Sequence, residues 1–282
     1  MLGGHDLLRN VRGTWLGVTK QGRIAVLTNF HEEGQVVQEA RSRGAMVNAF
    51  LTQTPDNPEN TQAFVKNLIE GEGVKGVGGF SLVCGKPGRP LAVVSNRTPS
   101  VEGVTWIAKK KGETVGLSNA AFGDRSWPKV LKGEELMSSV IAKSCGPNES
   151  KAELIEELLR VLSVDTLPRR QEGQGWTSYV KELRNSIFIP AIGGEGMDGV
   201  SADNVAAAKT SQQVQVNTQE DKPMSREGLS GKYGTQKQTV VLVDHQGRMT
   251  FVERTLYDAD GREIADKERD RMFEFDIEGW QS

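Results

Sequence analysis

The chain has 282 residues and a formal net charge of −2, with 35 basic residues interspersed among 37 acidic ones. This balance excludes the broad basic field of a nucleic-acid-binding protein, and no run reaches the ~18 apolar residues of a membrane span. Two cysteines, Cys84 and Cys145, are too few for a disulfide framework and favour a reducing, cytoplasmic location. The length suits one large domain over residues 1–282.

Strand-like segments come in pairs joined by short turns, which is the pattern of β-hairpins. Four such pairs are predicted: 15–19 with 23–28, 79–84 with 91–95, 104–108 with 114–118, and 239–243 with 248–252. Met272–Phe275 adds an edge strand. This many hairpins favours antiparallel sheets over parallel β-α-β units, so we expect the α+β class.

Helices are predicted between the hairpins from apolar residues at helical spacing. The stripes are Phe64, Val65, Leu68 and Ile69; Leu136, Met137, Val140 and Ile141; and Leu154, Ile155, Leu158, Leu159 and Leu162. The third is opened by Ser150 and Glu153, a capping box. All three stripes are expected to face the core.

Residues 193–231 are rich in Gly, Ala, Ser, Gln and Asp and nearly free of large apolar side chains. Such a segment cannot bury enough apolar surface to offset the entropy lost on ordering. We therefore predict a disordered insertion within the domain.

Several motifs favour an ordinary structural interpretation. Gly71–Gly76 matches a dinucleotide-binding fingerprint, but it follows a helix and precedes a strand, the reverse of the required order. Lys109–Lys111 reads as a solvated turn. The three histidines, His5, His31 and His245, lack metal-ligand spacing, so no metal site and no cofactor is expected.

The cysteines are not expected to be nucleophiles. Cys84 lies within an apolar strand and reads as a small buried hydrophobe. Cys145 precedes Gly146-Pro147 at a helix end, with no evident base nearby.

Two predicted strands end in a hydroxyl residue followed by asparagine, at Thr28-Asn29 and Ser118-Asn119. An Asn amide donates two hydrogen bonds in fixed directions, which suits stabilisation of a developing oxyanion. A cap or turn is the commoner role for either Asn alone. The repetition of the motif makes Asn29 and Asn119 the candidate oxyanion residues.

A series of motifs resembles one family in order and spacing. They are 12–17 (RGTWLG), 25–30 (AVLTNF), 42–44 (SRG), 79–82 (GFSL), 116–120 (GLSNA), 127–129 (WPK) and 233–235 (YGT). Residues 186–190 (SIFIP) resemble its fungal members. The family is the transport and Golgi organisation protein family, also called the NRDE family. The resemblance covers nearly the whole chain apart from residues 193–231.

The resemblance implies an N-terminal-nucleophile-hydrolase-like αββα sandwich, with two antiparallel sheets between helix layers. It also implies a role in Golgi organisation and protein secretion, links to lipid and haem homeostasis, and a Golgi-associated location. Asn29 and Asn119 match amide positions that serve the reaction in acylase-type enzymes of that fold. Thr28, Ser118, Trp15 and Thr235 are the candidate pocket-lining residues.

The chain departs from the family pattern at its start. Related hydrolases use a Cys after the initiator Met, whose removal leaves an α-amine that can act as the base for the thiol. Here residue 2 is Leu2, and Met1–Asp6 aligns well inside the family pattern. We therefore expect an N-terminal truncation that removes a core strand and the nucleophile.

Three functions follow from these observations. The first is a family protein in secretion and in lipid or haem handling, with little or no catalysis. The second is a cysteine-type amide hydrolase lacking its nucleophile here, which predicts an in-frame Met-Cys start upstream of Met1 in the genomic sequence. The third is a module that binds a small molecule at the end of the sheet.

Overall fold

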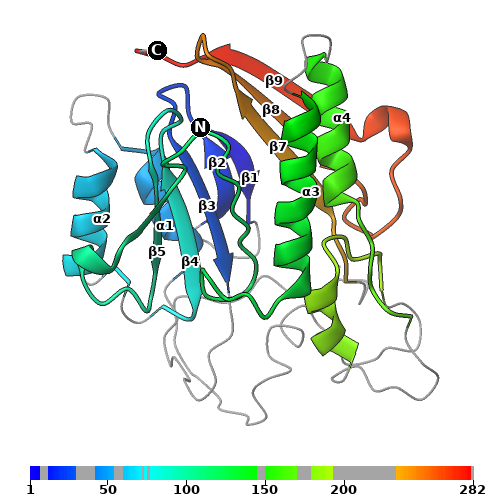
Figure 1. Cartoon of the computed structure of the whole chain (residues 1–282), viewed down its shortest axis with the longest axis horizontal. Helices are drawn as coiled ribbons and strands as arrows, with labels where there is room; N and C mark the ends of the chain where they lie inside the picture. Colours follow the sequence, from blue (N-terminus) through cyan, green and yellow to red (C-terminus); the bar gives the residue numbers. More distant parts are fainter. Residues whose placement is uncertain are drawn as a thin grey trace.

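The computed structural model describes residues 1–6, 12–29, 42–53, 60–71, 73–74, 77–144, 150–169, 179–192 and 233–280. The predicted insertion at 193–231, together with His31 and Cys145, lies outside these ranges. The described residues form antiparallel strands and helices, as expected of the α+β class (Figure 1). None of the helices in these ranges has the length and apolarity that a bilayer crossing requires.

The first sheet has six antiparallel strands in the order of the sequence. They are β1 (Leu2–His5), β2 (Thr14–Val18), β3 (Ile24–Asn29), β4 (Phe80–Gly85), β5 (Leu91–Ser95) and β6 (Thr105–Ile107). The predicted hairpins β2–β3 and β4–β5 are confirmed. The β2–β3 turn contains Gly22 with φ of 76°, a left-handed conformation that favours glycine.

Two strand predictions for this sheet need correction. No strand was predicted at the start of the chain, yet β1 pairs with β2 as an edge strand. Gly3 permits this pairing, because a Cβ there would lie 2.4 Å from the carbonyl oxygen of Leu16. Conversely, residues 114–118 form no strand after β6; within this stretch the Gly116 N–H donates to Glu134 Oε1 at 2.8 Å.

The second sheet has three antiparallel strands: β7 (Lys237–Val243), β8 (Arg248–Thr255) and β9 (Asp270–Asp276). The predicted β7–β8 hairpin and the predicted edge strand at Met272–Phe275 are both confirmed. Met272 and Phe273, on β9, keep 54% and 44% of their surface exposed.

The helices are α1 (Gly44–Leu51), α2 (Thr61–Glu70), α3 (Pro128–Ser144) and α4 (Lys151–Leu162). The last three contain the predicted apolar stripes, and α4 begins with the predicted capping box of Ser150 and Glu153. Short 3-10 turns occur at Val101–Gly103, Lys181–Asn185 and Asp266–Glu268. Helix α1 was not predicted, and its N-cap residue Arg43 makes no side-chain capping bond.

Three apolar clusters define four layers. The first cluster packs α1 and α2 against one face of the first sheet. The second lies between the sheets, where Leu16, Val18 and Ile24 meet Met249 and Phe251. The third packs α3 and α4 against the outer face of the second sheet. The order is therefore helices, sheet, sheet, helices (Figure 1).

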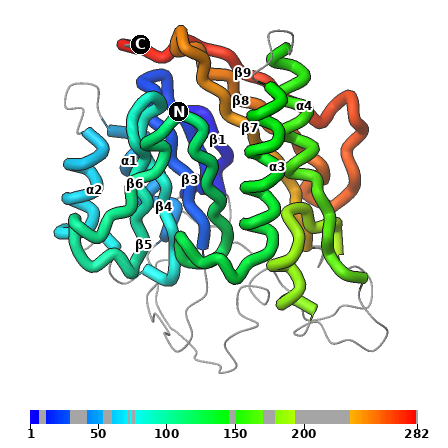
Figure 2. Tube along the Cα trace, viewed as in Figure 1, coloured from blue at the N-terminus to red at the C-terminus, as the bar shows by residue number. Residues whose placement is uncertain are grey.

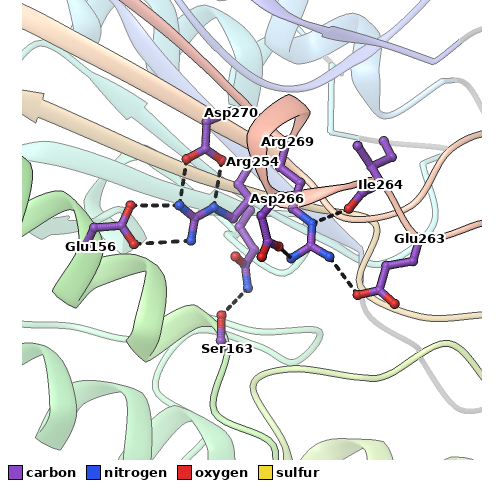
Figure 3. Close-up of polar contacts among 9 residues, drawn as sticks. Glu156, Ser163, Arg254, Glu263, Ile264, Asp266, Arg269 and Asp270 are labelled. Atoms are coloured by element: carbon purple, nitrogen blue, oxygen red, sulfur yellow. Dashed lines mark hydrogen bonds and ion pairs between the residues drawn. The ribbon is translucent and has the colours of Figure 1, made fainter.

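An arginine on β8 joins strand β9 and helix α4 (Figure 3). The Arg254 guanidinium donates to both carboxylate oxygens of Asp270, at 2.7 and 2.6 Å, and to Glu156 Oε1 at 2.8 Å. The hydrogen bonds that Arg254 donates to Asp270 are the main cause that raises the pKa of Arg254. Because the Arg254 side chain is only 20% exposed, water weakens these bonds less than it would at the open surface.

We predict that Arg254→Met lowers the free energy of unfolding by about 1–2 kcal/mol, because it leaves two carboxylates without their shared partner. Arg262→Met is the matched control, since Arg262 is 75% exposed and pairs with Asp260. Its cost should stay below about 0.5 kcal/mol. Urea denaturation of both variants measures the difference, and equal costs would contradict a role for Arg254 in joining the layers.

Candidate functional site

The two candidate asparagines lie in contact at one end of the first sheet. Asn119 Nδ2 donates to the carbonyl oxygen of Asn29 at 3.0 Å and to its Oδ1 at 2.9 Å. Asn29 is the last residue of β3, as predicted. Asn119 does not end a strand; it follows the irregular stretch 113–118. The structure thus brings the pair together although one of the two strand assignments was wrong.

The stretch 113–118 explains how Asn119 reaches Asn29. Strand β6 ends at Ile107, which pairs with Leu91 on β5. These residues lie at the end of the sheet where β3 begins, whereas Asn119 contacts the residue where β3 ends. The intervening chain therefore runs along the sheet before it turns into α3 (Figure 2). Gly116 packs against Val130 on α3, where an added Cβ would lie 3.0 Å from Val130 Cγ1.

Hydroxyl residues line adjacent strands at the same end. Thr28 on β3 pairs with Ser81 on β4, and Ser81 pairs with Ser95 on β5. Directly paired residues face the same side of a sheet, so the three form a row, here called the hydroxyl row. By alternation this row shares its face with Leu16 and therefore points towards the second sheet rather than towards α1.

Two hydroxyls of this row lack a hydrogen-bond partner. Thr28 Oγ1 and Ser81 Oγ are buried, and neither meets a donor or acceptor of the described protein. Ser95 differs, because its hydroxyl contacts Thr98 Oγ1 at 3.5 Å and accepts from the Arg97 N–H at 3.1 Å. A buried hydroxyl without a partner costs about 1–3 kcal/mol, so the pair marks a place where a polar group is expected.

Ser81 was missed as a candidate by sequence reasoning. It was noted only as part of a family motif, and its position beside Thr28 depends on the register of β3 and β4. The hydroxyl row continues into an apolar row one step along the strands, where Val26 pairs with Val83. The face therefore offers polar groups at its end and half-buried apolar groups behind them.

The other predicted pocket residues are not all gathered here. Ser118 adjoins Asn119 and is half-buried. Trp15 is 38% exposed and, by alternation with Leu16, belongs to the opposite face of the sheet. Thr235 precedes β7 of the second sheet, where its Oγ1 accepts from the Ile189 N–H at 2.9 Å. This hydrogen bond joins Thr235 to the backbone of Ile189 and does not bring the residue to the Asn29 end of the first sheet.

Cys84, the cysteine within the described ranges, supplies no reactive group at this site. Cys84 has no exposed surface, and burial raises the pKa of its thiol to about 12. Its side chain belongs to the cluster under α1 and α2, on the far face from the hydroxyl row. Among the described residues, no group of three or more His, Cys, Asp or Glu side chains could hold a metal ion.

Lys129 is a perturbed residue that sequence reasoning did not single out. It lies in the first turn of α3, one loop after Asn119, and its Nζ is 5.2 Å from the centre of the Trp127 ring. Burial lowers the pKa of Lys129 to about 8. No carboxylate of the described chain pairs with it. The sequence showed Lys129 only as part of the 127–129 motif, and the pKa shift appears only in the folded environment.

The shifted pKa of Lys129 predicts a pH-dependent stability. The folded value of about 8 lies below the unfolded value of 10.5, so between these pH values the unfolded chain binds more protons. Stability relative to a Lys129→Met variant should therefore rise as the pH increases through this window. Denaturation of both proteins across the window measures it, with Lys143→Met, an exposed position on the same helix, as control. A difference independent of pH would contradict the shift.

Comparisons with known proteins identify the family of this chain. A family model described as Transport and Golgi organisation 2 matches residues 1–258. The mouse Transport and Golgi organization 2 homolog is 28% identical over 257 residues, which cover 88% of this chain and 74% of the mouse protein. The human homolog is 28% identical over 272 residues, covering 92% and 78%. An uncharacterized protein of Saccharomyces cerevisiae is 22% identical over 264 residues, covering 89% and 77%. The chain belongs to the Transport and Golgi organisation 2 family.

Proposed function

We propose that this protein acts in Golgi organisation and protein secretion by binding an amphipathic small molecule at the Asn29 end of the first sheet. The family and the names of the mouse and human relatives support the cellular part of the proposal. The buried, unpartnered hydroxyls of Thr28 and Ser81 carry the molecular part. A cytoplasmic location with access to the Golgi fits both parts.

The chemistry of the site supports a ligand with a polar head and an apolar body. Thr28 and Ser81 each offer a donor and an acceptor on the face towards the second sheet. The Asn29–Asn119 pair offers amide groups at the end of β3, where Asn29 alternates to the other face together with Phe80. Val26 and Val83, one row behind, suit an apolar chain. A lipid-derived carbonyl or carboxylate compound fits this division, in agreement with the links to lipid homeostasis expected from the family resemblance.

Haem handling is the less supported form of the same proposal. A haem iron takes an axial His, Cys, Met or Tyr ligand. At this end of the sheet the described residues offer His5, whose Nδ1 lies 3.1 Å from the Arg12 carbonyl oxygen and 3.3 Å from Thr14 Oγ1. We favour an acyl-type ligand over haem because the unpartnered polar groups at this end are the hydroxyls of Thr28 and Ser81, which suit a carbonyl or carboxylate.

The order of layers supports the proposal of an N-terminal-nucleophile-hydrolase-like fold. Two antiparallel sheets lie between pairs of helices, which is the arrangement implied by the resemblance. We propose that the Asn29–Asn119 pair serves binding here rather than amide hydrolysis. The described thiol, Cys84, is buried on the other face of the sheet and cannot reach a substrate at the hydroxyl row.

The binding proposal predicts opposite effects of one substitution on stability and on affinity. Thr28→Val keeps the shape of the side chain and removes a buried hydroxyl without a partner, so stability should stay unchanged or increase by up to about 1 kcal/mol. Binding of a fluorescent long-chain fatty acid should weaken roughly 3- to 10-fold through loss of one hydrogen bond. Fluorescence titration and urea denaturation give the two readouts.

Asn119→Ala extends the test to the edge of the site. Asn119 is exposed, so its loss should weaken fatty-acid binding while the protein remains folded. Thr239→Val, on the second sheet, is the control and should leave affinity unchanged. If Thr28→Val and Asn119→Ala bind the probe as tightly as the unaltered protein, the hydroxyl row does not hold the ligand. Unfolding of Asn119→Ala would instead make Asn119 a structural residue.

A further inference from the structure

Turns from three separate parts of the sequence meet at the other end of the first sheet. Val18 pairs with Ile24, Ile24 pairs with Gly85, and Leu91 pairs with Ile107. The residues just beyond these positions therefore lie side by side, opposite to the Asn29 end (Figure 1). They carry a group of cations that we call the basic end: Lys20, Lys86, Arg89, Lys109, Lys110 and Lys111.

The side chains of the basic end are exposed and not neutralised. No ion pair joins any of them to a carboxylate within the described ranges. Two nearby carboxylates have other partners. Glu113 accepts from the backbone N–H groups of Lys109 and Lys110, at 2.7 and 3.2 Å, and Glu278 accepts from the Gln21 amide at 2.7 Å. Their partners are neutral groups, so both carboxylates keep their charge, and the six cations of the basic end still outnumber these two carboxylates in a chain whose formal charge is −2.

A buried arginine just before the start of β3, Arg23, adds a further positive charge beside the basic end. Arg23 is 2% exposed, and its Nη1 donates to the carbonyl oxygen of Gln53 at 2.6 Å, with no carboxylate of the described protein bound to it. Burial lowers the pKa of Arg23. Burial, followed by the charge of Arg23, lowers the pKa of Lys86. The two cations thus act on each other without an intervening anion.

We propose that the basic end docks on the phosphate-bearing headgroups of an anionic lipid membrane. A negatively charged bilayer attracts clustered lysines and arginines without requiring a shaped interface, and each such residue strengthens binding about fivefold near the surface. Turn tips that carry flexible lysines at one end of a molecule can all reach such a surface together. The charges and their placement thus match this partner.

Two other anionic partners fit less well. A protein interface needs a central apolar anchor. Of the exposed large hydrophobic residues in the described chain, Met1 lies at this end, since Leu2 pairs with Val18, but it is a terminal residue at the edge strand and the turns themselves contain none. Nucleic-acid recognition uses an element that enters a groove or aromatic side chains that stack on bases. The basic end consists of turns, and Trp280, which lies beside Gly88 of the β4–β5 turn, is half-buried and donates to the carbonyl oxygen of His245 at 3.1 Å.

The experiment is vesicle flotation with the full chain. We expect the protein to float with vesicles of phosphatidylcholine and phosphatidylserine, to remain behind with phosphatidylcholine alone, and to dissociate as salt rises. The variant Lys109→Gln, Lys110→Gln, Lys111→Gln should lose roughly 100-fold in affinity, about fivefold for each lysine. These turn residues are exposed, so circular dichroism should show an unchanged fold.

A matched variant separates local charge from net charge. Lys143→Gln, Lys181→Gln, Lys267→Gln removes the same charge from exposed positions outside the basic end and should bind as the unaltered protein does. Equal losses in both triple variants would overturn the proposal, as would no binding to phosphatidylserine vesicles at low salt. Tighter binding to a single-stranded RNA than to the vesicles would also overturn it, in favour of a nucleic-acid partner.

Discussion

The fold depends on burial of both faces of the first sheet, and strand β3 shows how one strand meets this constraint. Ala25 and Leu27 point towards α1 and α2, while Ile24 points towards the second sheet. A shift of one residue would exchange the two sets, so packing on both faces fixes the register. The positions of Thr28 and Asn29 at the end of the strand follow from that register.

Local sequence signals were sufficient for much of the sheet structure but not for all of it. The β2–β3, β4–β5 and β7–β8 hairpins each combine a turn with two apolar arms, and all three formed. Residues 114–118 have the same apolar character, but a strand also needs a neighbour for its backbone groups. Here the Gly116 N–H finds Glu134 on α3 instead. A pattern in one segment does not reveal whether such a neighbour exists.

At the candidate site, too, local sequence signals identified some residues and tertiary pairing was needed to identify others. Asn29 and Asn119 were identified from repeated local motifs, and they are in contact. Ser81 could not be singled out, because its significance comes from lying opposite Thr28 on another strand. Lys109–Lys111 read as an ordinary solvated turn until the pairing of β5 with β6 placed it beside Lys86 and Arg89. Tertiary register thus supplied the information that composition and spacing lacked.

The two ends of the first sheet can act independently because of their separation. Strand β3 has six residues, so its first and last Cα atoms lie about 17 Å apart. This exceeds the screening length of about 8 Å at physiological ionic strength. Charges at the basic end therefore act only weakly on Asn29 and Asn119. A molecule attached to a membrane through the basic end would hold the hydroxyl row away from the lipid surface. Ligand would then exchange with the surrounding solution, because the membrane contacts the opposite end of the sheet.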